Sequence, residues 1–237
     1  MEKDQQPEEI LNSREAVTRE SGKKGLNLPS AIIIAAIIIA SSIFINRGNA
    51  GSLGQSSETP LDLVADVTEE DVVRGDPKAD ITIIEYADFS CGYCAKYHPT
   101  LQQIVNESEG KVRWVYRHLP IFNKEAAIAS SCVGKLGGDS AFWTYADSLY
   151  LNKDKFSSDF YRSEAVKLGI EEAQYDYCIG DQILKSKIDR EFTEARLLLG
   201  FNATPYTVIV DKAGRKFSFA GALPYTELKV AIDGLAK

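Results

Sequence analysis

The pattern of hydrophobic and polar positions predicts a strand, a helix and a strand in the middle of the chain. Residues 81–86 form an apolar run that is typical of a buried strand, and residues 91–105 have the pattern of a helix. Polar and apolar side chains then alternate over residues 111–119, as in a second strand. This order of elements predicts a βαβ unit whose two strands lie parallel.

Helical patterns fill the following stretch, about residues 121–200. Residues 123–136 are rich in alanine, Gly137-Gly138 ends that helix, and Asp139 is the expected N-cap of a helix over residues 140–151. Further helices are expected at residues 160–168, with Ser158 or Asp159 as the N-cap, and, as two helices, across residues 171–199.

The end of the chain predicts a hairpin and a closing helix. Residues 206–210 have a strand pattern, the turn signal at residues 211–214 follows, and residues 215–219 form the returning arm. Residues 224–235 form the last helix. Together the elements predict an α/β fold, a small sandwich that is split by a helical subdomain.

An uncharged apolar run at residues 29–45 decides the expected compartment. As a helix this run spans roughly 25 Å, which is enough for the core of a bilayer. Lys23 and Lys24 precede the run and Arg47 follows it, a slight bias that favours a cytoplasmic N-terminus. We therefore expect a single-pass signal anchor in the cell membrane, with the rest of the chain outside the cytoplasm in an oxidising space.

The segments on either side of the apolar run lack the pattern of a folded domain. Residues 1–28 are polar and mixed in charge, as in a disordered cytoplasmic tail, and residues 46–70 begin with a Gly/Ser-rich stretch expected to be a flexible linker. Two alternatives remain for residues 29–45: a signal peptide cleaved near Ala50, which would release a secreted protein, and a buried core helix. The folded domain is expected over residues 71–237.

Composition limits the classes of function. The net charge of the 237 residues is −7, which offers no basic surface to favour nucleic acid. Two histidines and one methionine leave little material for a transition-metal centre, and we expect no bound cofactor. The four cysteines form an even count, as expected where disulfides form.

The first two cysteines lie where a predicted strand meets a predicted helix, in the sequence Cys91-Gly92-Tyr93-Cys94. A helix N-terminus carries a partial positive charge, which stabilises a thiolate on Cys91. Because the thiolate is the attacking species in disulfide exchange, this placement predicts a dithiol redox site.

Two other interpretations of this motif are weaker. Structural zinc needs four ligands, so Cys91, Cys94 and His98 would require Cys132 or Cys178 to complete the set. A purely structural disulfide between Cys91 and Cys94 would close so short a loop that it would constrain little.

Thr204-Pro205 is the second candidate element, directly before the predicted strand at residues 206–210. A proline at a strand entry can be cis, and a cis proline is usually a deliberate feature of a structure. The alternative is an ordinary trans proline that ends a loop.

These residues together resemble the thioredoxin superfamily, and the helical insertion resembles its DsbA-like branch of thiol–disulfide oxidoreductases. The resemblance covers about residues 70–237 and excludes the tail, the apolar run and the linker. The positions that carry it are Glu85, Cys91, Gly92, Tyr93, Cys94, Pro99, Thr204 and Pro205.

The resemblance implies a role for each position. Cys91 would be the nucleophile and Cys94 the resolving thiol. Pro205 would be a cis proline facing the dithiol, and Thr204 would contact the bound peptide through its backbone. Glu85 would be the buried acid that relays protons near the second cysteine, although a carboxylate at a strand end can also point to solvent.

The central dipeptide departs from the strongly oxidising members, which have Pro-His there. Gly92-Tyr93, with Thr204 before the proline, is similar to the isomerase and reductase members. Tyr93 supplies no charge to the thiolate, and we count it among the substrate-binding residues. Pro99 matches a proline that kinks the helix, which is a structural role.

The remaining cysteines and histidines are assigned structural roles. Cys132 and Cys178 both fall in the helical insert and are expected to form a second disulfide; the alternative is two buried free thiols. A lone histidine is seldom a catalyst without a placed partner, so His98 and His118 are expected to be structural or exposed.

The sequence therefore predicts a membrane-tethered thiol–disulfide oxidoreductase that oxidises thiols of exported proteins through a Cys91–Cys94 disulfide. Its partners would be unfolded or thiol-containing exported proteins and a membrane or soluble redox protein that resets the dithiol. One alternative is a reductase or isomerase kept reduced by a membrane partner. The other is a non-enzymatic module that binds polypeptides or a metal.

Overall fold

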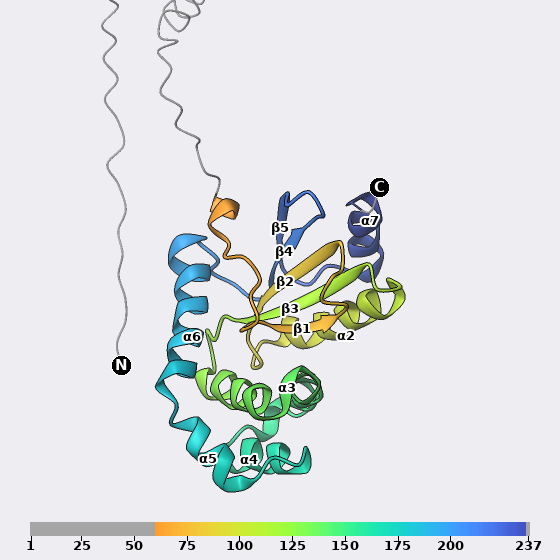
Figure 1. Ribbon diagram of the computed structural model, residues 1–237. Coiled ribbons are helices and arrows are strands. Elements are labelled where there is room, and N and C mark those ends of the chain that lie inside the picture. Colours follow the sequence, from red (N-terminus) through yellow and green to blue (C-terminus); the bar gives the residue numbers. More distant parts are fainter. Residues whose placement is uncertain (1–59, 236–237) are drawn as a thin grey trace, which may run out of the picture. The chain divides into compact units, whose positions relative to one another are not determined.

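The computed structural model describes residues 60–235 of the chain. Five strands form one sheet in the order β1-β3-β2-β4-β5 (Figure 1). The strands are β1 (Val72–Gly75), β2 (Ile81–Ala87), β3 (Val112–His118), β4 (Tyr206–Val210) and β5 (Lys216–Ala220).

The predicted βαβ unit is at the centre of the sheet. Helix α2 (Gly92–Glu107) connects β2 to β3, and these two strands pair in parallel with Ile81 opposite Val112. The outer pairs β1–β3, β2–β4 and β4–β5 are antiparallel. Strand β1 was not predicted, because its four residues are too few to show an alternating pattern.

The stretch between β3 and β4 is helical, as the sequence predicts. Figure 1 shows α3, α4 and α5 gathered on one side of the sheet, with α6 leading back from them past the strand ends. The helices are α3 (Lys124–Leu151), α4 (Ser158–Lys167), α5 (Glu172–Ile179), α6 (Gln182–Thr193) and the closing α7 (Tyr225–Leu235). Shorter turns are η1 (Pro60–Leu63), η2 (Lys153–Lys155) and the π-helical η3 (Glu194–Leu198).

Three details of the helical insert differ from the prediction or refine it. The long helix α3 is interrupted at Gly138, whose φ of 76° and ψ of −177° are not helical, so the predicted break is present within one assigned helix. The carboxylate of Asp139 accepts a hydrogen bond from the Val73 N–H of β1. The predicted N-cap of α4 was wrong: Ser157, not Ser158 or Asp159, accepts from the Phe160 N–H at 3.1 Å.

The sheet separates two apolar clusters because alternate residues of each strand point to opposite faces. The face toward α2, α3 and α7 buries Ile81 and Ile83 of β2 with Trp114 of β3. The opposite face buries Ile84 and Tyr86 of β2. Glu85 shares the first face with Ile81 and Ile83, so its carboxyl enters the core beneath α2.

A disulfide joins Cys132 of α3 to Cys178 of α5, with 5.7 Å between the Cα atoms. Both cysteines are buried, within the cluster that the helical insert shares with the sheet. The bond therefore ties together two helices that are far apart in the sequence.

The sequence-predicted tail at residues 1–28, the apolar run at residues 29–45 and most of the linker at residues 46–70 lie outside the described residues. Within residues 60–235, no helix is both long enough and apolar enough to cross a membrane.

The Cys132–Cys178 bond is expected to stabilise the helical insert. In the chain-entropy model, closing a loop of this sequence separation stabilises the fold by about 3–4 kcal/mol. We predict that the double variant Cys132→Ala/Cys178→Ala lowers the free energy of unfolding by this amount in urea titrations. The matched control is Cys91→Ala/Cys94→Ala, which removes two thiols without opening this loop. A loss below about 1 kcal/mol relative to that control would contradict the prediction.

Candidate functional site

Cys91 occupies the N-cap position of α2, with an extended backbone at φ −74° and ψ 125°. Its N–H donates to the carbonyl of Asp88 at 3.0 Å, which closes the turn between β2 and the helix. Its thiol donates to the carbonyl of Thr204 at 3.3 Å. The Thr204–Pro205 peptide bond is cis. The fold thus brings together the dithiol and the loop before β4, as the resemblance implied.

The two thiols differ sharply in acidity, and both are present as free cysteines. The pKa of Cys91 falls to about 5, chiefly because the thiol of Cys94 donates to it; burial opposes the fall, while the Thr204 side chain and the amides of Tyr93 and Cys94 add to it. Burial raises the pKa of Cys94, and the hydrogen bond that its thiol donates to Cys91 raises that pKa further. At neutral pH the reduced site therefore holds a Cys91 thiolate and a protonated Cys94.

Glu85 lies in the middle of β2 and its side chain is fully buried. The structure thus excludes the alternative in which this carboxylate points to solvent. Burial raises the pKa of Glu85 to about 8; the indole of Trp114 opposes the rise, and the charge of Cys91 adds to it. Neither carboxyl oxygen accepts a hydrogen bond of normal geometry among the described residues, although the Trp114 indole acts on the carboxyl. Glu85 can therefore both hold and release a proton near neutral pH.

Polar side chains that the sequence did not single out surround Glu85. Its register partners are Tyr116 on β3 and Thr207 on β4, and both are buried. The Tyr116 hydroxyl pairs with that of Tyr150 at 3.1 Å. Burial raises the pKa of Tyr116 and of Tyr97, so these hydroxyls stay protonated. Tyrosines in apolar stretches give no sequence signal that separates them from ordinary core residues.

Asp88 is another residue that sequence reasoning missed. Its buried carboxylate accepts from the Ser90 N–H at 2.7 Å, the Phe122 N–H at 2.6 Å and the Asn123 N–H at 3.3 Å. It therefore ties the turn before Cys91 to the loop that follows β3. Burial raises the pKa of Asp88, and the three amide donors oppose that rise. Its position three residues before Cys91 was the available signal.

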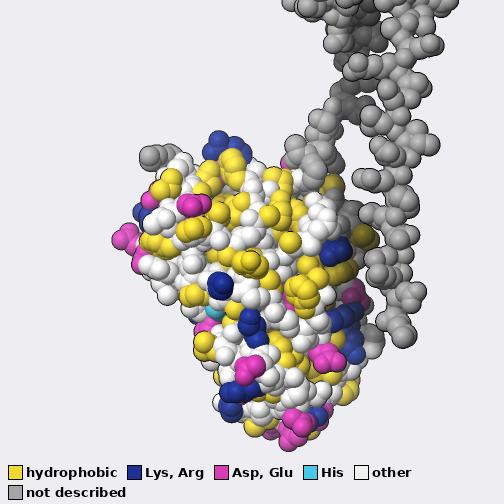
Figure 2. Space-filling model, turned by 180° about the vertical axis from the view of Figure 1, so that it is seen from behind, with side chains coloured by type: hydrophobic (Ala, Val, Ile, Leu, Met, Phe, Trp, Pro, Cys, Tyr) yellow, Lys and Arg dark blue, Asp and Glu magenta, His cyan; other side chains and the backbone are white. Residues whose placement is uncertain are grey.

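A cavity of about 370 Å³ opens beside the reactive thiol. Two of its side chains are large, apolar and exposed: Tyr93, 66% exposed, and Phe122, 69% exposed. Figure 2 shows one face of the molecule, where hydrophobic side chains gather in patches and charges of both signs are dense at the lower end. The cavity is lined by Ser90, Cys91, Gly92, Tyr93, Lys96 and Phe122.

Both histidines are buried, and both form hydrogen bonds with residues of the helical insert. His98 contacts Asp147 through its Nε2 at 2.6 Å. The Nε2 of His118 contacts the Ser131 hydroxyl at 2.8 Å, and burial lowers the pKa of His118 to about 3, so it is neutral. These contacts connect α2 and β3 to α3, which is a structural role.

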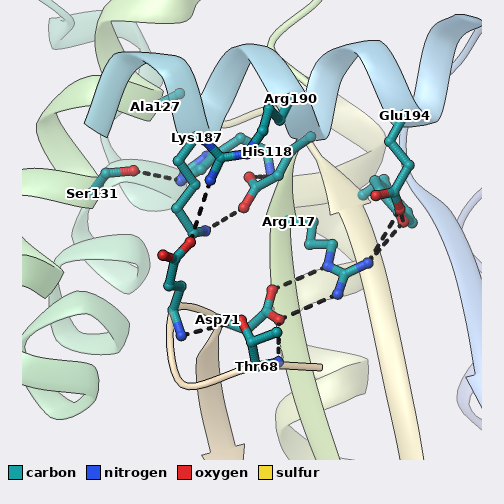
Figure 3. Close-up of polar contacts among 12 residues, drawn as sticks. Thr68, Asp71, Arg117, His118, Ala127, Ser131, Lys187, Arg190 and Glu194 are labelled. Atoms are coloured by element: carbon teal, nitrogen blue, oxygen red, sulfur yellow. Dashed lines mark hydrogen bonds and ion pairs between the residues drawn. The ribbon is translucent and has the colours of Figure 1, made fainter. Parts of the chain in front are cut away.

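A polar network joins α6 to the sheet, as Figure 3 shows. Arg117 of β3 donates to Asp71 at 3.0 Å and forms an ion pair with Glu194 at 3.2 Å. The next residue, His118, donates its N–H to Glu191 at 2.7 Å, and Lys187 pairs with the same carboxylate. Because Arg117 and Glu191 are buried and paired, the network holds the helical insert in one position against the strand ends.

The structure does not provide the four ligands that a structural zinc site at Cys91 and Cys94 would need. Cys132 and Cys178 are bonded to each other, so neither can complete a set with Cys91 and Cys94. Among residues 60–235 no group of three or more His, Cys, Asp or Glu side chains is arranged to hold a metal ion.

Comparison with known proteins gives the same fold. A family model described as thioredoxin matches residues 67–234. The chain is 30% identical to DsbA2 of Pseudomonas aeruginosa, with a TM-score of 0.58, over 69% of this chain and 93% of that one. It is also similar to alpha-DsbA1 of Wolbachia pipientis, with a TM-score of 0.66 and 23% identity over 75% of this chain and 96% of that one.

A curated relative matches over part of its length. The Na(+)/H(+) antiporter NhaA 3 of Salinispora tropica is 34% identical over 109 residues, which cover 45% of this chain and 17% of the antiporter. The chain therefore spans less than a fifth of that protein, and no transport activity is carried over to it.

The acidity of Cys91 depends first on the Cys94 thiol. We predict that Cys94→Ala raises the pKa of Cys91 above its value of about 5, because the thiolate loses its main hydrogen-bond donor. The measurement is the pH dependence of alkylation of the reduced protein. Cys94→Ser is the matched control: its hydroxyl still donates, so its rise should be smaller. An unchanged pKa in the alanine variant would refute this account.

Burial of Glu85 makes stability depend on pH. Its pKa is near 4.5 in the unfolded chain and about 8 when folded, so the unfolded state ionises first and stability falls between these two values. We predict that Glu85→Gln, which stays neutral, becomes progressively more stable than the parent over that window, by up to about 1.4 kcal/mol per pH unit, and that the difference is constant above it. Urea unfolding at several pH values measures this. A difference that does not change with pH would show that Glu85 is not buried as an acid.

Proposed function

The chain belongs to the thioredoxin family, as a DsbA-like thiol–disulfide oxidoreductase, and we propose that it oxidises thiols of exported proteins outside the cytoplasm. The observation that supports this direction is the low pKa of Cys91, about 5. A stabilised thiolate favours the reduced dithiol, and an enzyme whose reduced form is stabilised is a strong oxidant of other thiols.

The proposed reaction begins with the oxidised site. A substrate thiolate attacks the Sγ of Cys91, the Cys91–Cys94 bond breaks, and the sulfur of Cys94 leaves as a thiolate. Cys94 takes up a proton, because burial makes its charged form costly, and Glu85, a buried acid whose charge acts on Cys94, can supply it.

The second step releases the product. A second thiolate of the substrate attacks the substrate sulfur in the mixed disulfide, and Cys91 leaves as a thiolate. Its low pKa makes it a good leaving group, so this step favours transfer of the disulfide to the substrate. Two substrate thiols are thereby oxidised, and the enzyme is left with a reduced dithiol.

The substrate is proposed to lie as an extended segment along the Thr204–Pro205 loop. The carbonyl of Thr204 is already within hydrogen-bond distance of Cys91 Sγ, so a peptide joined to that sulfur would pass directly over this loop. Tyr93, exposed and next to Cys91, would contact the same segment.

The cellular setting is part of the proposal. Residues 29–45 would anchor the chain in the membrane with residues 60–235 outside the cytoplasm, where structural disulfides such as Cys132–Cys178 persist. A redox partner in or near the membrane would then reoxidise Cys91 and Cys94 after each cycle.

The opposite direction of electron flow is supported by one feature. Gly92 and Tyr93 between the cysteines contribute no charged group to the thiolate. A reductase or isomerase would require a partner that keeps the dithiol reduced. The non-enzymatic alternative is disfavoured by the thioredoxin match over residues 67–234 and by the 30% identity to DsbA2 of Pseudomonas aeruginosa.

The reduction potential decides between the two directions. We predict that the full chain, equilibrated with glutathione buffers of known potential, gives a value toward about −120 mV rather than about −270 mV. Cys91→Ala should show no dithiol transition and no exchange activity, which assigns the signal to this pair. A value near that of the reducing members would reverse the proposed electron flow.

A further inference from the structure

Two lysines, Lys96 and Lys153, form a charged rim beside Cys91, and they come from separate elements of the structure. Lys96 belongs to the first turns of α2 and lines the cavity beside Cys91; its Nζ is 5.7 Å from the centre of the Tyr93 ring. Lys153 belongs to η2, in the helical insert, and its Nζ lies 3.8 Å from the point where a Cβ on Gly92 would stand. The fold therefore brings two ammonium groups to the residues between the cysteines.

Neither ammonium group is neutralised by the described part of the protein. Lys135 pairs with Asp181 and Lys212 with Asp80, whereas no ion pair among the described residues includes Lys96 or Lys153. The turn η2 carries a second lysine and one aspartate, so its own net charge is positive. The rim is thus a positive region on a chain whose net charge is −7.

Two carboxyl groups near the dithiol, those of Glu85 and Asp88, are buried and not exposed at this rim. Glu85 is fully buried beneath the cysteines, and Asp88 is 2% exposed and bonded to three backbone amides. Among the described residues, the side chains that line the cavity include no acid. A segment that docks at Cys91 therefore meets Lys96 without a carboxylate among the lining residues. The one exposed carboxylate of η2, Asp154, is outnumbered there by Lys153 and Lys155.

The apolar side of the cavity completes the surface. Tyr93 and Phe122 both line the cavity, and the backbone of Phe122 is held there because its N–H donates to Asp88 at 2.6 Å. Exposed aromatic rings beside unpaired ammonium groups suit a peptide with both apolar and acidic side chains.

We propose that the preferred partners present their reacting cysteine in an extended segment with an acidic residue next to it. Lys96 and Lys153 contact the carboxylate, while Tyr93 and Phe122 contact the neighbouring apolar side chain. The inference rests on the proposed exchange at Cys91 and adds a charge preference to it. Because such ion pairs are exposed, each is worth a few-fold in rate, and the preference falls as salt screens it.

The test compares peptides that differ in one charge. Two dithiol peptides, identical except for Asp or Lys next to the first cysteine, are oxidised by the full chain, and kcat/KM is measured for each at low and high salt. We expect the Asp peptide to react about tenfold faster at low salt, with a smaller ratio at high salt. A ratio between peptides cancels any change in the reactivity of Cys91 itself.

The variants locate the source of the preference. Lys96→Gln/Lys153→Gln should bring the ratio close to one. The matched control Lys212→Gln/Lys229→Gln removes two lysines that pair with Asp80 and Asp233, away from the dithiol, and should keep the parent ratio.

The outcomes separate this inference from the proposed function. Equal oxidation of both peptides by the parent overturns the charge preference, and a parent ratio that survives in Lys96→Gln/Lys153→Gln overturns its assignment to these two lysines. Either result leaves the oxidase assignment standing. If neither peptide is oxidised, the proposed function itself fails, and the inference fails with it.

Discussion

Burial without compensating hydrogen bonds is the constraint on which the site depends. Cys91, at the helix N-terminus, receives donors from Cys94 and nearby amides, so its charged form is favoured despite burial. Cys94 and Glu85 lie deeper and receive too few hydrogen-bond donors to offset their burial, so their neutral forms are favoured. The two thiols and the carboxyl of Glu85 therefore differ in pKa. This difference allows Cys91 to leave as a thiolate while Cys94 takes up a proton.

The helical insert shapes the site as well as covering the core. It brings Tyr150 against Tyr116 and Lys153 against Gly92, although both residues are far from the dithiol in the sequence. Its position is held by the Cys132–Cys178 bond and by the buried pairs of Arg117 with Asp71 and Glu194. If the insert were held less firmly, neither the buried surroundings of Glu85 nor the position of Lys153 in the charged rim would be fixed.

Local sequence patterns predicted most of the helices and strands. They failed where a strand was too short to show a pattern, or where adjacent residues were about equally suited to cap a helix. The run at β2 and the alternation at β3 are long enough to be recognised, whereas the four residues of β1 are not. Ser157 replaced the expected Ser158 or Asp159 as a helix cap, because adjacent residues of similar capping propensity cannot be ranked without the backbone. The break at Gly138 was predictable, since few residues other than glycine adopt a positive φ.

The sequence by itself determined the dithiol, its place at a strand-to-helix junction, and the candidates Glu85, Thr204 and Pro205, because these depend on residue type and on spacing along the chain. Only the tertiary structure decided that Glu85 is buried without a hydrogen bond of normal geometry, that Asp88 ties two loops together, and that Lys96 and Lys153 meet at one rim. The physical reason is distance: acidity and charge fields depend on which groups lie within a few ångströms, and pairs of residues more than fifty positions apart are brought together only by the packing of helices on the sheet.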